Sequence, residues 1–66
     1  MQNLIAHITR HFLAQGFDVK HVDIDLENEL YTVECADDTY RFEVGSDDDD
    51  MPFHSLTRTV TIPLPE

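Results

Sequence analysis

The chain has 66 residues, enough for a single domain over residues 1–66, and 41% of them are hydrophobic, which distinguishes it from a disordered acidic tail. Its 14 Asp and Glu residues against 4 Lys and Arg give a formal net charge of −10. This charge repels nucleic acid and anionic membranes and attracts cationic surfaces, so it argues against direct binding to nucleic acid or a membrane and favours a protein partner with a basic surface.

The first predicted element is a helix over residues 3–15, where apolar side chains recur at helical spacing. Asn3 is placed to cap its start, and Gly16 stands where a left-handed residue ends a helix. Basic and neutral polar side chains occupy the opposite face. The apolar stripe consists of Met1, Leu4, Ile5, Ile8, Phe12 and Leu13.

After Gly16 the apolar period changes to two, which is typical of half-buried strands. Three such runs, over residues 20–26, 30–36 and 39–44, are separated by short turns and predict consecutive antiparallel pairing. One face of this sheet must cover the helix, so its side chains are expected to point inward. The expected inward residues are Val22, Ile24, Leu26, Tyr31, Val33, Cys35, Tyr40, Phe42 and Val44.

Residues 45–52 are expected to form a loop that contains four consecutive aspartates and ends at Met51-Pro52. A fourth strand is expected over residues 55–62, with Arg58 as an inward exception and Pro63 as its end. The predicted fold is therefore α+β: one N-terminal helix packed on a small antiparallel sheet of three to four strands, in the order α-β-β-β-β.

The outward strand positions carry many carboxylates. Alternate residues of a strand lie about 6.6 Å apart and cross-strand neighbours about 5 Å apart, so these side chains are expected to form an array of single negative charges, as DNA phosphates do. The alternative is that they are ordinary solvated positions. The candidate partner-binding residues are Asp23, Asp25, Glu27, Glu34, Glu43, Asp47, Asp48, Asp49 and Asp50.

Other kinds of site have less support in the sequence. The aspartate run lacks the ligand spacing of a calcium loop. His7 and His11 have a metal-compatible spacing on the helix face that also carries Arg10, but Cys35 is expected inward and no CxxC or HExxH motif is present. No activated nucleophile or glycine-rich phosphate loop is indicated. We therefore expect no enzyme, no metal site and no cofactor.

The cellular location follows from what the sequence lacks. A single cysteine cannot form an internal disulfide, no apolar run approaches the roughly 20 residues of a membrane span, and the N-terminus does not resemble a signal peptide. These features predict a soluble, cytoplasmic protein. Because a core of this size is marginal in stability, a homodimer is left open.

In its size, its acidity and its lack of a catalytic motif, the chain resembles the DNA-mimicking inhibitors that phages encode, among them anti-CRISPR and anti-restriction proteins. The resemblance rests on composition and length, and no motif carries it. It implies an inhibitor in the host cytoplasm that occupies the basic nucleic-acid-binding cleft of a target protein. The alternatives are an acidic protein of the halophile type, whose charge serves solubility, and a structural or adaptor protein that joins a partner complex through its edge strand.

Overall fold

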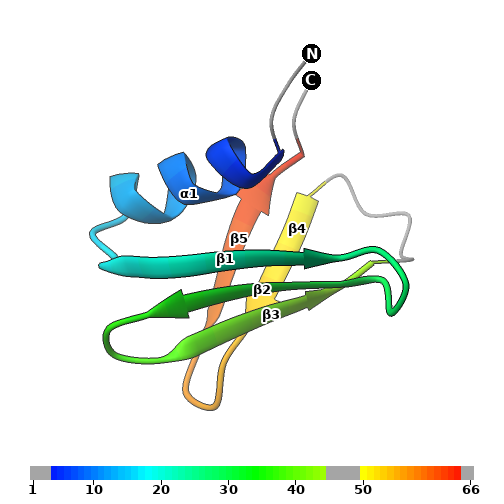
Figure 1. Cartoon of the computed structure of the whole chain (residues 1–66). Coiled ribbons are helices and arrows are strands. Elements are labelled where there is room, and N and C mark those ends of the chain that lie inside the picture. The colour runs from blue at the N-terminus through cyan, green and yellow to red at the C-terminus, as the bar shows by residue number, and fades with distance from the viewer. Residues whose placement is uncertain (1–3, 45–49, 65–66) are drawn as a thin grey trace.

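The computed structural model describes residues 4–44 and 50–64. They form one helix followed by a five-stranded antiparallel sheet in which each strand pairs with the next along the chain (Figure 1). The α+β class is confirmed, with one strand more than the sequence predicted. No helix in the described residues is long and apolar enough to cross a membrane. The elements are α1 (Leu4–Ala14), β1 (Val19–Asp25), β2 (Leu30–Cys35), β3 (Thr39–Glu43), β4 (Asp50–His54) and β5 (Thr59–Pro63).

The helix ends at a glycine, as predicted. Gly16 has a φ of +93°, and its N–H donates to the carbonyl of Leu13 at 3.0 Å. The N–H of Phe17 donates to the carbonyl of Phe12 at 3.1 Å. This pair of bonds is a Schellman motif, which needs a residue that tolerates positive φ. The other predicted cap, Asn3, lies outside the described residues.

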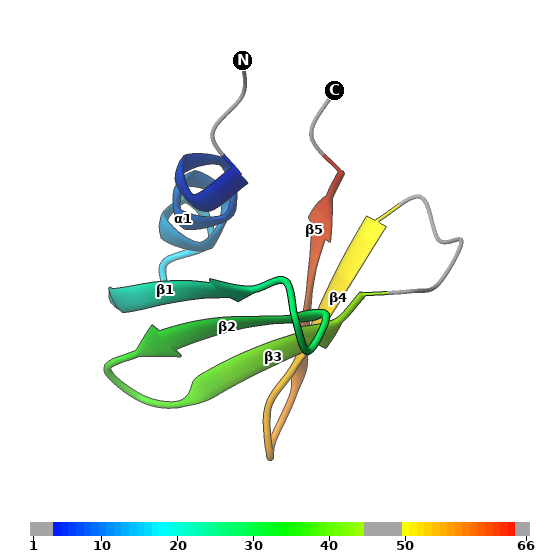
Figure 2. The same cartoon turned by 45° about the vertical axis from the view of Figure 1, so that its right-hand side comes forward.

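The helix lies against both outermost strands of the sheet, β1 and β5 (Figures 1 and 2). The helix therefore closes the open side of the curled sheet. The sheet covers a narrow stripe of the helix surface. Ile8 and Phe12 are fully buried, whereas Ile5 and Leu13, both expected in the apolar stripe, are 45% and 54% exposed.

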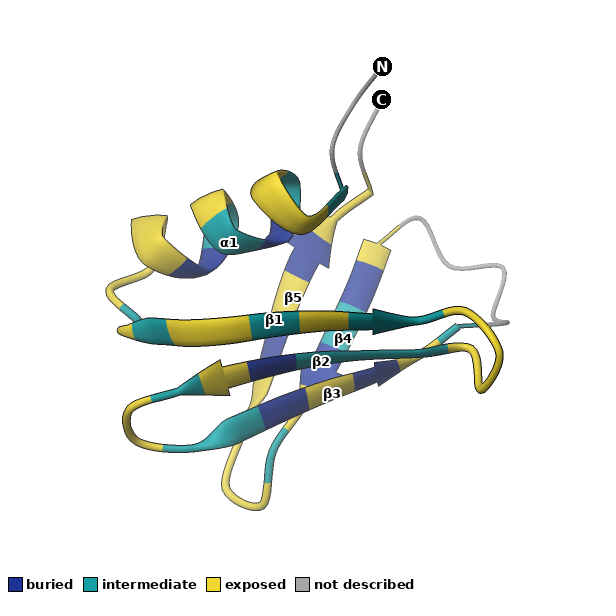
Figure 3. Cartoon of the chain, in the orientation of Figure 1, coloured by how far each residue is buried: buried dark blue, intermediate teal, exposed yellow. Residues whose placement is uncertain are grey.

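The core is built around the ring of Phe12. Its centroid lies 5.3 Å from that of Phe53, 5.5 Å from Tyr40 and 5.4 Å from Phe17, with the first two in edge-on geometry. Such pairs add about 0.5–1.5 kcal/mol each beyond the area they bury. Figure 3 shows buried positions in every strand but β1, whose inward residues are half-buried. The buried residues of the helix and the strands form one core cluster. The buried side chains are Ile8, Phe12, Val33, Tyr40, Phe42, Met51, Phe53, Val60 and Ile62.

The prediction that Met51-Pro52 closes a loop is wrong, because both residues lie in β4. Met51 and Phe53 alternate with Pro52 in the pattern of a strand, and both are buried. A proline inside a central strand argues against a strand on sequence grounds, since it lacks a ladder donor. Here β4 is central, between β3 and β5.

The hydrogen-bond alternation explains how β4 tolerates this proline. The N–H of Ser55 donates to the carbonyl of Arg58 at 2.9 Å, which sets the phase of the β4–β5 hairpin. Because backbone groups alternate in direction along a strand, the odd-numbered residues of β4 bond to β5, as Ser55 does. The even-numbered residues of β4 therefore direct their backbone N–H and C=O groups toward β3. Pro52 thus interrupts the β3–β4 ladder and leaves the β4–β5 ladder intact. Among the described residues, β3 and β4 pair in register at Arg41 and His54 alone.

The fourth strand predicted over residues 55–62 is also placed too early. Residues 55–58 form the turn between β4 and β5, and Leu56 at this turn is 98% exposed. Arg58 is therefore a turn residue and no inward exception. In the same way Leu26, expected inward, is 74% exposed because β1 ends at Asp25.

Candidate functional site

The outer face of the sheet, opposite the core, carries carboxylates that the strand register keeps apart. Asp23 lies opposite Thr32, Glu34 lies opposite His21, and Glu43 lies opposite Leu30. Within β1, β2 and β3, all of whose residues are described, no carboxylate has another directly across from it. This spacing avoids the destabilisation that like charges cause when directly paired. Asp23, Glu34 and Glu43 are exposed, but they do not form the continuous array expected from the sequence.

Basic and neutral side chains fill the positions between these carboxylates. Arg41 is paired with Thr32 on one side and with His54 on the other, near the middle of the outer face. His54 Nδ1 lies 2.9 Å from the hydroxyl oxygen of Thr59, within hydrogen-bond distance. The outer face therefore carries charges of both signs.

A denser group of described carboxylates lies at one end of the sheet, around the β1–β2 turn and the end of β3 (Figure 1). The N–H of Val44 donates to the carbonyl of Glu29 at 2.8 Å, and Leu30 is paired with both Asp25 and Glu43. Asp47, Asp48 and Asp49 belong to the connection from β3 to β4 and lie outside the described residues. We call the described carboxylates here the acidic end: Asp25, Glu27, Glu29 and Glu43.

The ion pairs between described residues lie at the opposite end of the sheet. Lys20 Nζ is 3.2 Å from Asp18 Oδ2, and Arg58 Nη2 is 2.9 Å from Asp37 Oδ2. No carboxylate of the acidic end forms an ion pair with any described cation. Among the described residues, the ion pairs thus lie at one end of the sheet and none lies at the other, although Asp38 at the paired end has no ion-pair partner.

Asp25 has a local structural role within the acidic end. Its carboxylate accepts a 2.7 Å hydrogen bond from the side-chain amide of Asn28 and a 3.2 Å bond from the backbone N–H of the same residue. These two bonds, the side-chain bond first, lower the pKa of Asp25 because they favour the charged form. The charge of Asp25 therefore also closes the β1–β2 turn.

Glu29 belongs to the acidic end although the sequence did not single it out. It stands in the same turn with a φ of +53°, and it is exposed. Residues 27–29 separate two predicted strands, and strand alternation does not give the direction of a side chain in a turn. Its proximity to Glu43 follows from the pairing of β2 with β3, which the sequence did predict.

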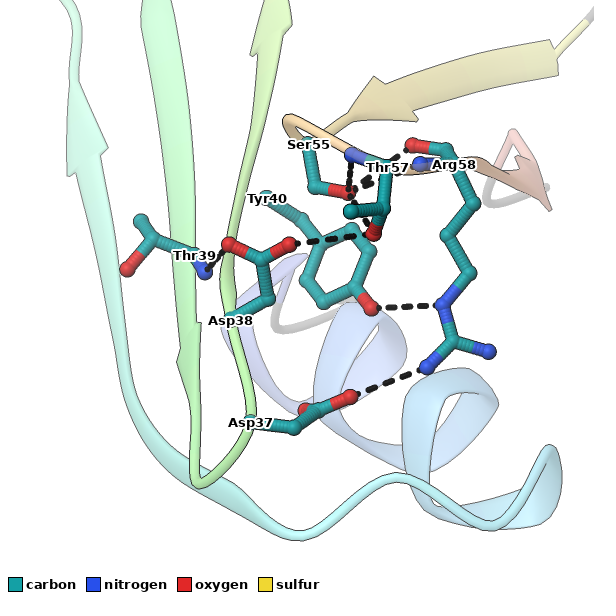
Figure 4. Close-up of polar contacts among 7 residues, drawn as sticks. All are labelled: Asp37, Asp38, Thr39, Tyr40, Ser55, Thr57 and Arg58. Carbon is teal, nitrogen blue, oxygen red and sulfur yellow. Dashed lines mark hydrogen bonds and ion pairs between the residues drawn. The ribbon is translucent and has the colours of Figure 1, made fainter.

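The opposite end holds a polar network that serves the fold (Figure 4). Arg58 Nε donates to the hydroxyl of Tyr40 at 3.0 Å, and its guanidinium lies 4.9 Å from the centroid of the Phe17 ring. The hydrogen bond with Tyr40, as the largest cause, and the contact with Asp37 raise the pKa of Arg58. Asp38 accepts bonds from the N–H of Thr39 and, at 3.4 Å, from the hydroxyl of Thr57, which joins the β2–β3 and β4–β5 turns.

The histidines and the cysteine do not gather into a metal site. His7 Nε2 is 2.7 Å from the carbonyl oxygen of Pro63, and its ring lies 4.5 Å from that of His11. Cys35 is half-buried, and its pKa is raised by burial and then by Asp37 and Asp18. Within residues 4–44 and 50–64, no group of three or more His, Cys, Asp or Glu residues is placed to hold a metal ion.

A shallow groove of about 900 Å³ runs over the outer face beside the acidic end. It follows the β3–β4 seam, where Pro52 provides no backbone donor. Glu43 belongs both to the groove and to the acidic end, so the groove and the acidic end adjoin one another. The side chains that line the groove include Leu30, Arg41, Glu43, Pro52, His54 and Leu56.

Comparison with protein-family models, curated proteins and solved structures found no significant match for this chain. The class of protein is therefore defined by its own residues: a small α+β protein with a group of carboxylates without ion-pair partners at one end of its described sheet and a groove of polar and apolar side chains beside it.

Proposed function

We propose that this chain is a small acidic protein-binding inhibitor that acts as a DNA mimic. It docks its acidic end on the basic nucleic-acid-binding cleft of a target protein, and it blocks that cleft by occupying it. Asp23 and Glu34 on the outer face, and the Asp47–Asp50 run, extend the contact. The observation that carries the proposal is the set of carboxylates without ion-pair partners at one end of the described fold.

The energetics favour such a contact over internal neutralisation. A net charge of −10 produces a field that steers a cationic surface toward the protein and speeds association. Carboxylates fixed on strand ends and a tight turn lose little conformational freedom on binding, compared with a disordered acidic tail. The adjoining groove accepts an apolar side chain of the target, with charged residues as its rim, as in other protein–protein interfaces.

The proposal predicts a competition that depends on salt. The protein is immobilised, and basic nucleic-acid-binding proteins are captured from a lysate of its source at low and high NaCl concentration. A captured protein is then bound to a fluorescent DNA duplex and titrated with the acidic chain. We expect stoichiometric displacement of the duplex and a loss of affinity at high salt, where the Debye length is shortened. Undisturbed, simultaneous binding of the duplex would reject the mimicry mechanism.

A pair of charge-matched variants locates the contact. Glu27→Gln with Glu29→Gln removes two charges from the acidic end, and Asp18→Asn with Asp37→Asn removes two at the opposite end, where they are already paired. Both variants have the same net charge. The acidic-end variant is expected to displace the duplex more weakly than the opposite-end variant. Equal losses would show that net charge alone drives binding.

A further inference from the structure

One cation on the outer face of the sheet has no ion-pair partner among the described residues. Arg41 is exposed near the centre of that face, in register with Thr32 of β2 and His54 of β4. Its guanidinium forms no ion pair or hydrogen bond with residues 4–44 or 50–64, whereas Lys20 and Arg58 are both paired with aspartates. The charge of Arg41 is therefore available to a binding partner.

The surroundings of Arg41 favour the binding of a carboxylate. Arg41 lines the groove of about 900 Å³ together with the apolar side chains of Leu30, Pro52 and Leu56. A charge pair beside such side chains becomes stronger when a partner covers them and excludes water. The backbone of Arg41 is paired with a strand on each side, so its position is fixed before binding. The five N–H donors of a guanidinium form a planar fork that matches a carboxylate.

The charge of Arg41 also departs from simple DNA mimicry. A DNA backbone carries negative charges alone, and a cation among the carboxylates repels a uniformly basic cleft. In chain order along β3, the charged residues that line the groove alternate in sign: Asp38, Arg41 and Glu43. The surface of a partner that complements this order is basic and contains a carboxylate.

We propose that Arg41 binds a carboxylate that interrupts the basic surface of the target, and that it thereby selects this target among basic nucleic-acid-binding proteins. This inference rests on the proposed function, because it names the chemistry of the surface on which the acidic end docks. A basic cleft that contains the carboxylate gains an ion pair with Arg41. A basic cleft that lacks it faces an unpaired cation, which opposes the wrong complex.

Two charge-matched variants test the proposal. Arg41→Gln and Arg10→Gln each remove one exposed cation, and Arg10 is also without an ion pair among the described residues, but it lies on α1, which packs on the core side of the sheet. Circular dichroism melts confirm that both variants fold. Their affinities are measured by calorimetry against the purified protein that the immobilised wild-type chain captures.

The sign of the effect distinguishes a specific ion pair from net charge. Net charge alone predicts that both variants bind a basic protein somewhat more tightly. We expect this for Arg10→Gln, whereas Arg41→Gln should bind roughly 10-fold more weakly, because it loses a charged hydrogen-bonded contact worth about 1.5 kcal/mol. Binding by Arg41→Gln that is as tight as that by Arg10→Gln overturns the proposal.

Cross-linking identifies the partner group. The chain contains a single lysine, Lys20, so Arg41→Lys adds one amine at a known place. A water-soluble carbodiimide joins an amine to a carboxylate that is already in contact with it. Mass spectrometry of the cross-linked complex should show position 41 joined to an aspartate or glutamate of the captured protein, and Arg10→Lys should give no such link at position 10. Links from position 41 to the chain's own carboxylates alone would contradict the proposal.

The outcomes separate this inference from the proposed function. If the captured protein releases its DNA duplex and binds Arg41→Gln as well as the wild type, mimicry stands and the role of Arg41 is wrong. If the duplex stays bound while Arg41→Gln binds more weakly and position 41 is cross-linked, mimicry is rejected and the carboxylate contact stands. A chain that captures no basic protein at low salt overturns both.

Discussion

The buried hydroxyl of Tyr40 shows how one hydrogen bond closes the end of this small core. Tyr40 is fully buried, and Nε of the exposed Arg58 donates to its hydroxyl at 3.0 Å. Tyr40→Phe should lower the free energy of unfolding by about 0.5–1.5 kcal/mol, and each 1 kcal/mol corresponds to about 4–8 °C in Tm for a domain of this size. Thermal melts monitored by circular dichroism measure the change.

Tyr31 provides the control for this variant. It is half-buried, and its hydroxyl has no hydrogen-bond partner among the described residues. Tyr31→Phe removes the same atom without removing a bond, so its Tm should stay near that of the wild type. An equal loss in both variants would mean that the contact of Arg58 with Tyr40 contributes nothing to stability.

Asp25 makes the stability of the β1–β2 turn depend on pH. Its hydrogen bonds from Asn28 lower its pKa in the folded state below the ordinary value of 3.8. A lowered folded pKa contributes stability that is present above the unfolded pKa and is lost as the pH falls through the folded one. Asp25→Asn should therefore be less stable than the wild type at pH 7, and this difference should shrink as the pH falls below about 3.8.

Urea melts of the two proteins between pH 7 and pH 2.5 measure that difference. Asp23→Asn is the matched control, since Asp23 lies on the same strand and its side chain makes no hydrogen bond in the described residues. Its difference from the wild type should not follow the course seen for Asp25→Asn. A difference for Asp25→Asn that stays constant with pH would contradict the role assigned to the turn.

At the level of elements, the sequence predicted what local patterns encode. Helical spacing and Gly16 defined α1, and the period of two with short turns defined β1, β2 and β3. β4 was missed because Pro52 removes a donor, and a single sequence does not tell which neighbour that donor would face. The answer depends on the phase of the β4–β5 hairpin, which is set by a turn bond at Ser55.

The candidate site was predicted to a similar degree. The sequence identified exposed carboxylates such as Asp23, Glu34 and Glu43, because strand alternation gives the direction of a side chain. It did not give the cross-strand register, which places Thr32 and Arg41 between them. The concentration of charge at one end depends on which turns lie together, and it is a property of the assembled sheet.

Pro52 itself yields a prediction about the β3–β4 seam. Pro52→Val supplies an N–H that faces β3 and keeps a side chain suited to a strand. We expect this new amide to bond to the carbonyl of Glu43 and to be protected from hydrogen exchange. The new hydrogen bond should stabilise the folded state by about 1 kcal/mol. The loss of proline gives the unfolded chain more conformational freedom, which costs a similar amount, about 1 kcal/mol, so the free energy of unfolding should change little. Exchange at position 52 as fast as in an unstructured peptide would show that the seam is held open by other contacts.

For the whole molecule, the arrangement of charge separates two roles for acidity. Charge that serves solubility needs no particular distribution, whereas charge that serves recognition must be gathered and left unpaired. Here Lys20 and Arg58 neutralise carboxylates at one end, and no described cation does so at the other. Concentrated charge repels itself, so the acidic end is expected to reduce stability in the free protein.

This self-repulsion should appear in the response of stability to salt. We expect the free protein to be folded at about 10 mM NaCl, where the Debye length is about 30 Å, and its Tm to rise as the salt is raised to about 150 mM, where it is about 8 Å. At low salt, Glu27→Gln with Glu29→Gln should melt at a higher temperature than the wild type, and the difference should close as salt is added. Asp18→Asn with Asp37→Asn loses paired charges and should show no such gain. A protein of the halophile type would instead be unfolded at low salt and fold only in molar NaCl, so a melt at 10 mM distinguishes the two roles before any partner is known.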